Sequence, residues 1–245
     1  MKDLFLSQAI FRTKDILHDF TSERSMQARL KTLTESGRIV KIKNGVYATV
    51  NVITEDVFAN RFEIASALFE GACVAYHSAL EFHGLGNQMY SEVQVFTEKR
   101  NMPFEFNGLE YKFFLPQIKS GVMNLEQNAK IAVTDLERTL VDCINRIDLA
   151  GGLEELVTAI NGITYLNEEN LILYLKEYNK KYLYKKAGFF LSLLKSELLS
   201  QNFFNVCRQN ISVKIEDISE NKNMPRKTDK SWRLIYPEKL INTEN

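Results

Sequence analysis

The chain has 245 residues, of which 45% are hydrophobic, and this is enough to bury one large core or two moderate ones. Lys and Arg together number 31, as do Asp and Glu, so no global field directs the protein to nucleic acid or to an acidic membrane. Residues 1–50 nevertheless hold nine cations against five anions, which makes any such preference a local property.

Three short helices are predicted at the start of the chain. They cover residues 3–11, 14–19 and 23–35. Thr13 is the predicted N-cap of the second helix, and Thr21 or Ser22 that of the third. In the third helix, apolar residues recur at i, i+4 and i+7 until Gly37 ends the pattern. The side chains that are expected to face its core are Met26, Leu30 and Leu33.

A β-hairpin is predicted next, in the segment SGRIVKIKNGVYATV at residues 36–50. Apolar and basic residues alternate along its first strand, so Val40 and Ile42 are expected on one face and Lys41 and Lys43 on the other. The turn residues Asn44 and Gly45 supply the positive φ angles that a tight hairpin needs. The inward residues of the second strand are Val46, Ala48 and Val50. Three helices followed by a hairpin are typical of a winged helix-turn-helix domain, which we assign to residues 1–50.

A second, larger domain is predicted over residues 51–245. It begins with an amphipathic helix at 55–69 and continues with a small β-sheet within about 71–135. The predicted strands are 72–76, 93–97, 111–115 and 130–134, and a short helix is predicted at 77–83. Four helices follow within about 135–200, at 136–147, 153–160, 168–178 and 186–199. A polar segment at 217–230 is predicted to be a mobile linker before a terminal strand at about 231–236. The predicted fold class is therefore α+β, with an N-terminal winged helix-turn-helix, a small β-sheet and a helical C-terminal part.

The third helix is the strongest candidate for contact with DNA. If its apolar stripe is buried, then Arg24, Gln27, Ala28 and Lys31 face outward, and Arg and Gln have the geometry for bidentate contact with guanine and adenine. The hydroxyls of Ser22 and Ser25 lie at the helix N-terminus, where phosphates bind. The alternative is a solvated helix face that serves protein contacts only.

The hairpin adds cations to the same domain. Arg38, Lys41 and Lys43, with Asn44 at the turn, are expected to contact the phosphate backbone and so to make the affinity sensitive to salt. The alternative is an edge hairpin that its lysines protect from aggregation. The complete set of predicted DNA-binding residues is Ser22, Arg24, Ser25, Gln27, Ala28, Lys31, Arg38, Lys41, Lys43 and Asn44.

A basic and aromatic segment stands out in the last third of the chain. Its lysines, which are interleaved with three tyrosines, are Lys176, Lys180, Lys181, Lys185 and Lys186. Such a face can bind nucleic acid or an acidic partner. It is also common on long helices that have no partner, and both interpretations stay open.

Two groups of residues could suggest metal or catalytic chemistry. Cys73, His77 and His83 lack a second ligand pair with regular spacing, so we interpret them as core residues. Asp135 and Glu137, with the nearby Asp142, resemble the metal ligands of a nucleotidyl transferase, but Asp135 is better placed as the N-cap of a helix. No phosphate-binding loop or nucleophile elbow is present. We therefore expect neither an enzyme nor a cofactor or bound metal.

The cysteine count bears on the compartment. Three widely spaced cysteines, Cys73, Cys143 and Cys207, argue against a disulfide framework and favour a reducing environment. The first residues do not form a signal peptide, and the most apolar stretch, at 188–194, is too short to cross a bilayer. A cytoplasmic protein without a membrane partner is the expectation.

Several short motifs occur together in order along the chain. They are Gly37-Arg38-Ile39 with Asn44-Gly45-Val46-Tyr47, Tyr76-His77-Ser78-Ala79-Leu80 with His83-Gly84-Leu85, Thr134-Asp135-Leu136-Glu137-Arg138-Thr139-Leu140-Val141-Asp142, and Trp232-Arg233-Leu234. In this order they resemble the AbiEi family of antitoxins, from the AbiE abortive-infection type of toxin-antitoxin pair. The third motif carries one extra residue between Thr134 and Arg138 relative to the family pattern.

The resemblance implies a DNA-binding autorepressor whose larger domain counteracts a nucleotidyltransferase-like toxin. The expected partners are operator DNA and that toxin, whether or not the two proteins touch. Because one winged helix buries little surface, we expect two copies on an inverted repeat. The alternative is a protein-interaction module that holds its toxin directly and uses the winged helix as a scaffold.

Overall fold

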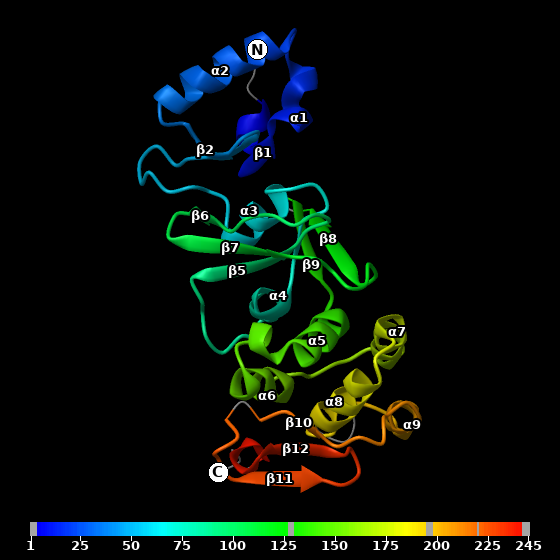
Figure 1. The fold of residues 1–245 in the computed structure, drawn as a ribbon. Coiled ribbons are helices and arrows are strands. Elements are labelled where there is room, and N and C mark those ends of the chain that lie inside the picture. Colours follow the sequence, from blue (N-terminus) through cyan, green and yellow to red (C-terminus); the bar gives the residue numbers. More distant parts are fainter. Residues whose placement is uncertain (1–3, 127–129, 195–197, 220, 242–245) are drawn as a thin grey trace. The chain divides into compact units, whose positions relative to one another are not determined.

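The structure, a computed structural model, describes residues 4–126, 130–194, 198–219 and 221–241. This part of the chain contains helices and three separate β-sheets, so the fold class is α+β (Figure 1). The chain forms two compact units. Unit 1 comprises Met1–Val74, Ser91–Pro116 and Met123–Val133, and unit 2 comprises Ala75–Tyr90, Gln117–Val122 and Thr134–Asn245. The boundary expected at residue 50 falls inside unit 1, and independent folding of residues 1–50 stays a prediction.

Unit 1 begins with a small antiparallel sheet and the helices that cover it. Its elements are η1 (Leu4–Ser7), β1 (Ile10–Arg12), α1 (Thr13–Ile16), η2 (Leu17–Asp19), α2 (Glu23–Glu35), β2 (Ile39–Lys43) and β3 (Val46–Thr49). The strand order β1-β3-β2 makes β3 central. The predicted helix at 3–11 is wrong where β1 lies, because Ile10 and Phe11 are buried in pairing with β3 rather than in a local helix.

Helix α2 has the predicted ends. The Ser22 hydroxyl accepts a hydrogen bond from the Ser25 amide, and the Ser25 hydroxyl accepts one from the Ser22 amide, which forms a capping box. Met26, Leu30 and Leu33 are at most 2% exposed, as predicted. Their partners in the core are Phe5, Phe11, Ile16, Ile39 and Tyr47. Each buried side chain of this size stabilises the fold by about 1.5–3 kcal/mol.

The second predicted helix, at residues 14–19, is present as α1 followed by η2. Its N-cap is Arg12, and the predicted cap, Thr13, is instead the first helical residue. The reason lies in the hairpin, since the Thr13 amide donates to the Gly45 carbonyl oxygen at 2.9 Å. This bond fixes where the helix starts.

The hairpin turns at Asn44-Gly45, as predicted. Only Gly45, with φ of 78°, adopts the positive φ that was expected of both turn residues. Val46 and Ala48 are buried as predicted, and so are the two residues that alternate with them. The latter are buried because β3 is the central strand and is covered on both faces.

A β-bulge at Ile42 separates the two lysines of β2. Lys41 pairs with Tyr47 whereas Lys43 pairs with Val46, which leaves Ile42 as the extra residue. Adjacent residues of β3 point to opposite faces of the sheet, and so do the lysines that pair with them. The predicted common face of Lys41 and Lys43 is therefore wrong, because regular alternation breaks at the bulge.

A six-stranded mixed sheet forms the larger part of unit 1. Its strands are β4 (Cys73–Val74), β5 (Glu92–Phe96), β6 (Phe104–Phe106), β7 (Leu109–Phe114), β8 (Val122–Glu126) and β9 (Lys130–Thr134), in the order β6-β7-β5-β4-β9-β8. All four predicted strands are present with small shifts of their ends. The two edge strands are absent from the prediction, because β6 is very short and β8 lacks a buried apolar alternation.

Helix α3 (Arg61–Ala67) is shorter than the helix predicted at 55–69. The segment before it forms a loop that is closed by a bridge between Val50 and Val57. Asn60 then caps α3, since its side chain accepts from the amides of the second and third helical residues. The first residues of the predicted helix therefore belong to this loop and are not helical.

Unit 2 contains the helical part of the chain. Its helices are α4 (Tyr76–Phe82), α5 (Leu136–Asn145), η3 (Ile147–Ala150), α6 (Leu153–Asn161), α7 (Glu168–Tyr178), α8 (Lys181–Leu191), α9 (Gln201–Gln209) and η4 (Glu238–Ile241). Helices α4, α5, α6 and α7 match the predictions closely, whereas α9 is absent from the prediction. The helix predicted at 186–199 is wrong in its bounds, because Asn179 in the left-handed region ends α7 and lets α8 begin directly afterwards. Residues 195–197 of that prediction lie outside the described residues.

The C-terminal segment forms a third sheet rather than a linker. Strands β10 (Glu216–Asp217) and β11 (Arg226–Asp229) flank β12 (Leu234–Pro237), all in orange to red in Figure 1. Residue 220 of the predicted linker lies outside the described residues. Trp232 closely approaches Gly188 of α8, where a Cβ atom would lie 2.2 Å from its ring. The Phe189 ring of α8 also packs on Tyr236 of β12, so the sheet lies against this helix.

Candidate nucleic-acid interface

The outward face of α2 carries the side chains predicted to contact bases. Arg24, Gln27, Ala28 and Lys31 are all exposed. Their exposure follows from the buried stripe on the other side of the helix, since residues three and four apart share a face. The face therefore presents one guanidinium and one carboxamide, which match the hydrogen-bonding edges of guanine and adenine in a major groove.

The ammonium of Lys31 has a carboxylate neighbour one turn further along α2. Its Nζ atom lies 3.8 Å from Glu35 Oε1, and both side chains are well exposed. At this distance no hydrogen bond joins the two groups, and such a surface pair is weak and screened by salt. The charge of Lys31 therefore remains available to a phosphate.

The N-terminus of α2 uses both of its candidate serines in the cap. Besides the reciprocal bonds of the capping box, the Ser25 hydroxyl donates to the Ser22 carbonyl oxygen at 2.8 Å. Ser25 must exchange this bond before it can donate to a phosphate. The Ser22 hydroxyl accepts from the Ser25 amide at 3.2 Å, which leaves its own hydrogen for an external acceptor.

Two cations of the hairpin are exposed near α2. The Arg38 amide donates to the Leu33 carbonyl oxygen at 3.0 Å, so Arg38 directly follows the last turn of the helix. Lys41 is exposed and pairs with Tyr47, whose ring belongs to the core beneath α2. Arg38 and Lys41 are thus the hairpin cations on the side of the candidate reading helix.

Lys43 has a different environment from the one expected. Its Nζ atom lies 3.3 Å from the centroid of the Phe69 ring, and partial burial lowers the pKa of Lys43. The neighbouring turn residue Asn44 is exposed. Lys43 therefore is not presented to solvent beside Lys41, because the bulge turns it to the opposite face.

The five lysines predicted as a partner-binding face do not form one surface. Lys176 and Lys181 are exposed, whereas Lys185 is fully buried. The Lys185 ammonium donates to the Lys214 carbonyl oxygen at 2.5 Å and lies 3.6 Å from Glu216 Oε1. Assignment of Lys185 to an external partner is therefore wrong, because the β10 region supplies its counterion.

The remaining two lysines are engaged with tyrosine rings. Lys180 Nζ lies 5.3 Å from the Tyr178 ring centroid and 5.8 Å from that of Tyr182, and it bonds to Gln117. Lys186 lies 5.5 Å from the Tyr182 ring, and burial lowers the pKa of Lys186. The predicted face is thus reduced to two exposed lysines and two that contact aromatic rings.

The acidic group at the start of α5 has a structural role, as predicted. Asp135 caps the helix by accepting from the Arg138 amide at 2.7 Å. Glu137 accepts from the backbone of the N-cap residue of α7 at 2.7 Å. Both carboxylate oxygens of Asp142 accept from Arg138 Nε, and Tyr178 donates its hydroxyl hydrogen to one of them. Burial raises the pKa of Asp142 to about 6 against the attraction of Arg138.

The two histidines near β4 have protein partners. His77 is 2% exposed, and its Nε2 atom lies 2.9 Å from Glu155 Oε1. His83 Nε2 lies 2.8 Å from the Thr134 carbonyl oxygen. Cys73 is buried in β4. His77 and Cys73 are therefore core residues, as interpreted, whereas His83 is only half-buried.

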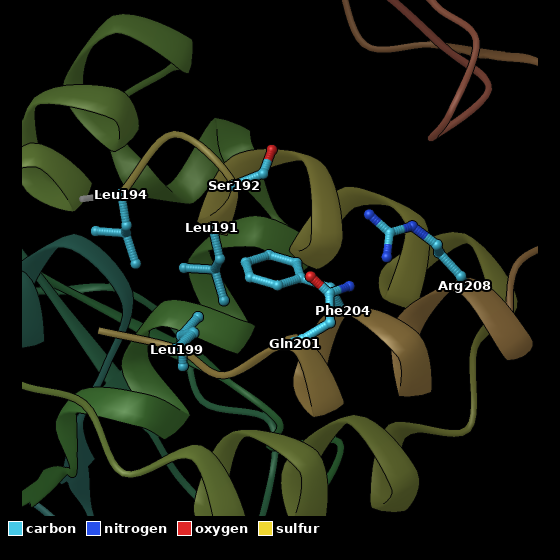
Figure 2. Close-up of a pocket in the computed structure, with 7 residues that line it drawn as sticks. All are labelled: Leu191, Ser192, Leu194, Leu199, Gln201, Phe204 and Arg208. Carbon is cyan, nitrogen blue, oxygen red and sulfur yellow. The ribbon is translucent and has the colours of Figure 1, made fainter. Parts of the chain in front are cut away.

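A cavity of about 310 Å³ lies where α8 ends and α9 begins (Figure 2). Its lining residues are Leu191, Ser192, Leu194, Leu199, Gln201, Phe204 and Arg208. The Arg208 guanidinium lies 5.1 Å from the Trp232 ring, so the one cation of this lining already has an aromatic partner. The cavity contains none of the residues predicted to bind DNA.

Comparison with known proteins supports the fold class. No family model matches the chain, and no curated protein matches it. Among solved structures, the crystal structure of the RV2827C protein from Mycobacterium tuberculosis matches with a TM-score of 0.58. The alignment covers 93% of this chain and 86% of that chain at 12% sequence identity, which indicates a shared fold and nothing further. Among the described helices, none has the length and apolarity needed to cross a bilayer.

Proposed function

We propose that the first part of unit 1 is a winged helix-turn-helix that binds duplex DNA. Helix α2 is the reading helix, and the β2–β3 hairpin is the wing. The observation that carries the proposal is the two-sided character of α2, with its buried apolar stripe opposite the exposed Arg24, Gln27 and Lys31. An amphipathic helix of this kind, next to a basic hairpin, matches the docking geometry of such domains.

The exposed residues divide into two roles. Arg24 and Gln27 contact base edges, which give sequence preference, whereas Lys31, Arg38 and Lys41 neutralise phosphates. Three phosphate contacts make the logarithm of the affinity fall with the logarithm of the salt concentration, with a slope of about −0.9 for each phosphate. Lys43 is left out of this set because it contacts Phe69 instead of solvent.

We further propose that the protein is an antitoxin that represses its own operon. This step rests on the resemblance of its motifs to the AbiEi family. Two of those motifs contribute to buried pairs, since His77 contacts Glu155 of α6 and Arg138 contacts Asp142 within its own motif. Their side chains therefore support the architecture of unit 2, and a role in counteracting a nucleotidyltransferase-like toxin falls to its surface.

The test is fluorescence anisotropy of the purified protein with DNA from upstream of its own gene and with a scrambled duplex, over a range of salt concentrations. Tight and selective binding with a steep salt slope supports the repressor. Equal, weak binding to both duplexes contradicts it. Growth rescue of cells that express the toxin encoded beside the gene, with and without the antitoxin, tests the second step.

Direct capture of the toxin is the alternative, and the exposed Lys176 and Lys181 at the junction of α7 and α8 favour it. Stoichiometric co-purification with the toxin that persists at high salt supports this alternative. Rescue without co-purification supports an indirect mechanism.

A further inference from the structure

Two cations of the proposed DNA-binding domain are held by two neighbouring residues that follow α3. The ammonium of Lys43, from the wing, lies 3.3 Å from the centroid of the Phe69 ring. The ammonium of Lys14, from α1, forms an ion pair with the next residue, Glu70. All four residues belong to unit 1.

The Phe69 ring is fixed for this role by the six-stranded sheet. It packs edge to face on Phe113 of β7, with ring centroids 5.0 Å apart and an angle of 89° between their planes. The Lys43 ammonium lies over the face of this ring, and an aromatic face attracts a cation through its quadrupole. Partial burial in the same place lowers the pKa of Lys43.

The Glu70 carboxylate holds the Lys14 ammonium of α1 in a similar way. The hydrogen bond from Lys14, with a further attraction from Arg12, lowers the pKa of Glu70. Lys14 and Glu70 are both substantially exposed, but the Lys14 ammonium, unlike that of Lys31, donates a hydrogen bond directly to its carboxylate partner. A carboxylate on an exposed lysine occupies the place that a DNA phosphate would take.

We infer that Phe69 and Glu70 are an internal mask that withholds Lys43 and Lys14 from DNA. This inference rests on the proposed DNA binding and deepens it. The mask leaves Arg38 and Lys41 as the phosphate contacts of the hairpin and so limits binding to DNA of any sequence. Release of the mask adds two counterion-releasing contacts and weakens discrimination between the operator and other DNA.

The experiment compares variants by anisotropy with the scrambled duplex across salt concentrations. Phe69→Leu keeps an apolar side chain but removes the aromatic face, and Glu70→Gln removes the carboxylate. We expect each to steepen the slope of log affinity against log salt by about 0.9, and the double variant by about 1.8. Lys43→Met in the Phe69→Leu background should abolish the increment from Phe69, and Lys43→Met alone should leave the parental slope unchanged.

A matched control separates the mask from the overall change in charge. Glu105→Gln removes one exposed carboxylate from β6, elsewhere in unit 1. It should leave the slope as it is in the parent. An equal effect of Glu70→Gln and Glu105→Gln contradicts the mask at Glu70, and a slope that falls by about 0.9 in Lys43→Met alone contradicts it at Phe69.

An NMR readout keeps the inference separate from the proposed function. The Phe69 ring shifts the ε-methylene protons of Lys43 upfield, and this shift should disappear in Phe69→Leu without loss of the melting transition. If the shift is absent from the parent, the mask fails whatever the DNA results are. If the shift is present but neither the parent nor any variant binds duplex at low salt, the proposed DNA binding fails.

Discussion

The Nε2 atom of His77 lies 2.9 Å from Glu155 Oε1, and both side chains are almost fully buried. On the other side of the ring, Nδ1 lies 3.0 Å from Glu81 Oε1. Glu155 also accepts from the amides of Asn87 and Gln88, so it ties the loop after α4 to α6. Both ring nitrogens can donate at once only in the protonated imidazolium. Burial alone lowers the pKa of His77, but the two carboxylates outweigh it, and the pKa is raised.

The first prediction follows from these shifts. His77 contributes stability that is fully present below its unfolded pKa of about 6.5 and is lost as pH rises through its higher folded value. The contribution of Glu155 to stability depends on pH in the opposite sense. Burial raises the pKa of Glu155, but the hydrogen bonds from His77 and from two amides outweigh burial, so the pKa is lowered. Its contribution is therefore lost as pH falls through the folded pKa. We expect the melting temperature to be highest at about pH 4.5–6.5, as far as this cluster decides it.

The measurement is the melting temperature against pH for the parent and for His77→Gln. The variant should lose the decline on the alkaline side. His18→Gln is the control, because His18 is exposed beside Asp19. An alkaline limb that is the same in the parent and in His77→Gln would show that the cluster does not carry the pH dependence.

The second prediction concerns the buried pair of Arg138 and Asp142. Both side chains are at most 1% exposed. Arg138→Met leaves the Asp142 carboxylate buried without its counterion, which we expect to cost about 3–5 kcal/mol in the free energy of unfolding measured with urea. Arg146→Met breaks an exposed pair with Asp148 and should cost less than about 1 kcal/mol. Similar costs for the two variants would contradict the assigned difference in burial.

The third prediction concerns Gly188, which packs on Trp232. A Cβ atom there would lie 2.2 Å to 2.7 Å from three atoms of the indole. We expect Gly188→Ala to lower the free energy of unfolding by about 1–3 kcal/mol, despite the better helix propensity of Ala, because the ring must move. The control Gly162→Ala meets only a flexible Leu85 methyl at 3.2 Å as its nearest neighbour. A neutral Gly188→Ala would place the indole elsewhere.

The fourth prediction separates base reading from phosphate contact. Arg24→Ala should reduce discrimination between the operator and a variant operator by about 1–3 kcal/mol in binding free energy, since it removes one bidentate contact. Lys41→Met should weaken binding to all duplexes alike and flatten the salt slope by about 0.9. Lys222→Met, an exposed lysine of unit 2, is the control. Unchanged binding in both Arg24→Ala and Lys41→Met would overturn the docking through α2.

The fifth prediction tests the cap of the reading helix. Ser22→Ala removes the acceptor for the Ser25 amide and should cost about 1 kcal/mol of stability. Asn60→Ala removes two such bonds at α3 and should cost a similar amount. We expect only Ser22→Ala also to weaken DNA binding, because α3 lies outside the reading helix. Circular dichroism melts and anisotropy with the same samples distinguish the two effects.

Local patterns in the sequence predict the helices well where the cap and the apolar stripe lie in the same stretch. Helix α2 begins after the cap Ser22 and buries the stripe that starts at Met26, and α7 begins after the cap Asn167. Each signal lies within one or two turns, so no distant residue is needed to read it. The outward face of α2, and with it most of the candidate site, follows from the same pattern.

Tertiary structure decided the features that depend on distant partners. Strand β1 exists because β3 offers its edge to Ile10 and Phe11, and the polar segment before Trp232 contains a strand because β11 pairs with β12. In the sequence, nothing distinguishes Lys43 and Lys185 from an exposed lysine. The bulge turns Lys43 toward Phe69, and the β10 region brings Glu216 to Lys185.

The sequence by itself thus determined most of the helices that carry their own cap and apolar stripe, where the basic residues cluster and which face of α2 is free. Only the tertiary structure decided which of those cations remain available to a partner. The physical reason is that helix periodicity and capping are local, whereas the solvation and the counterion of a lysine depend on side chains that folding brings from elsewhere in the chain.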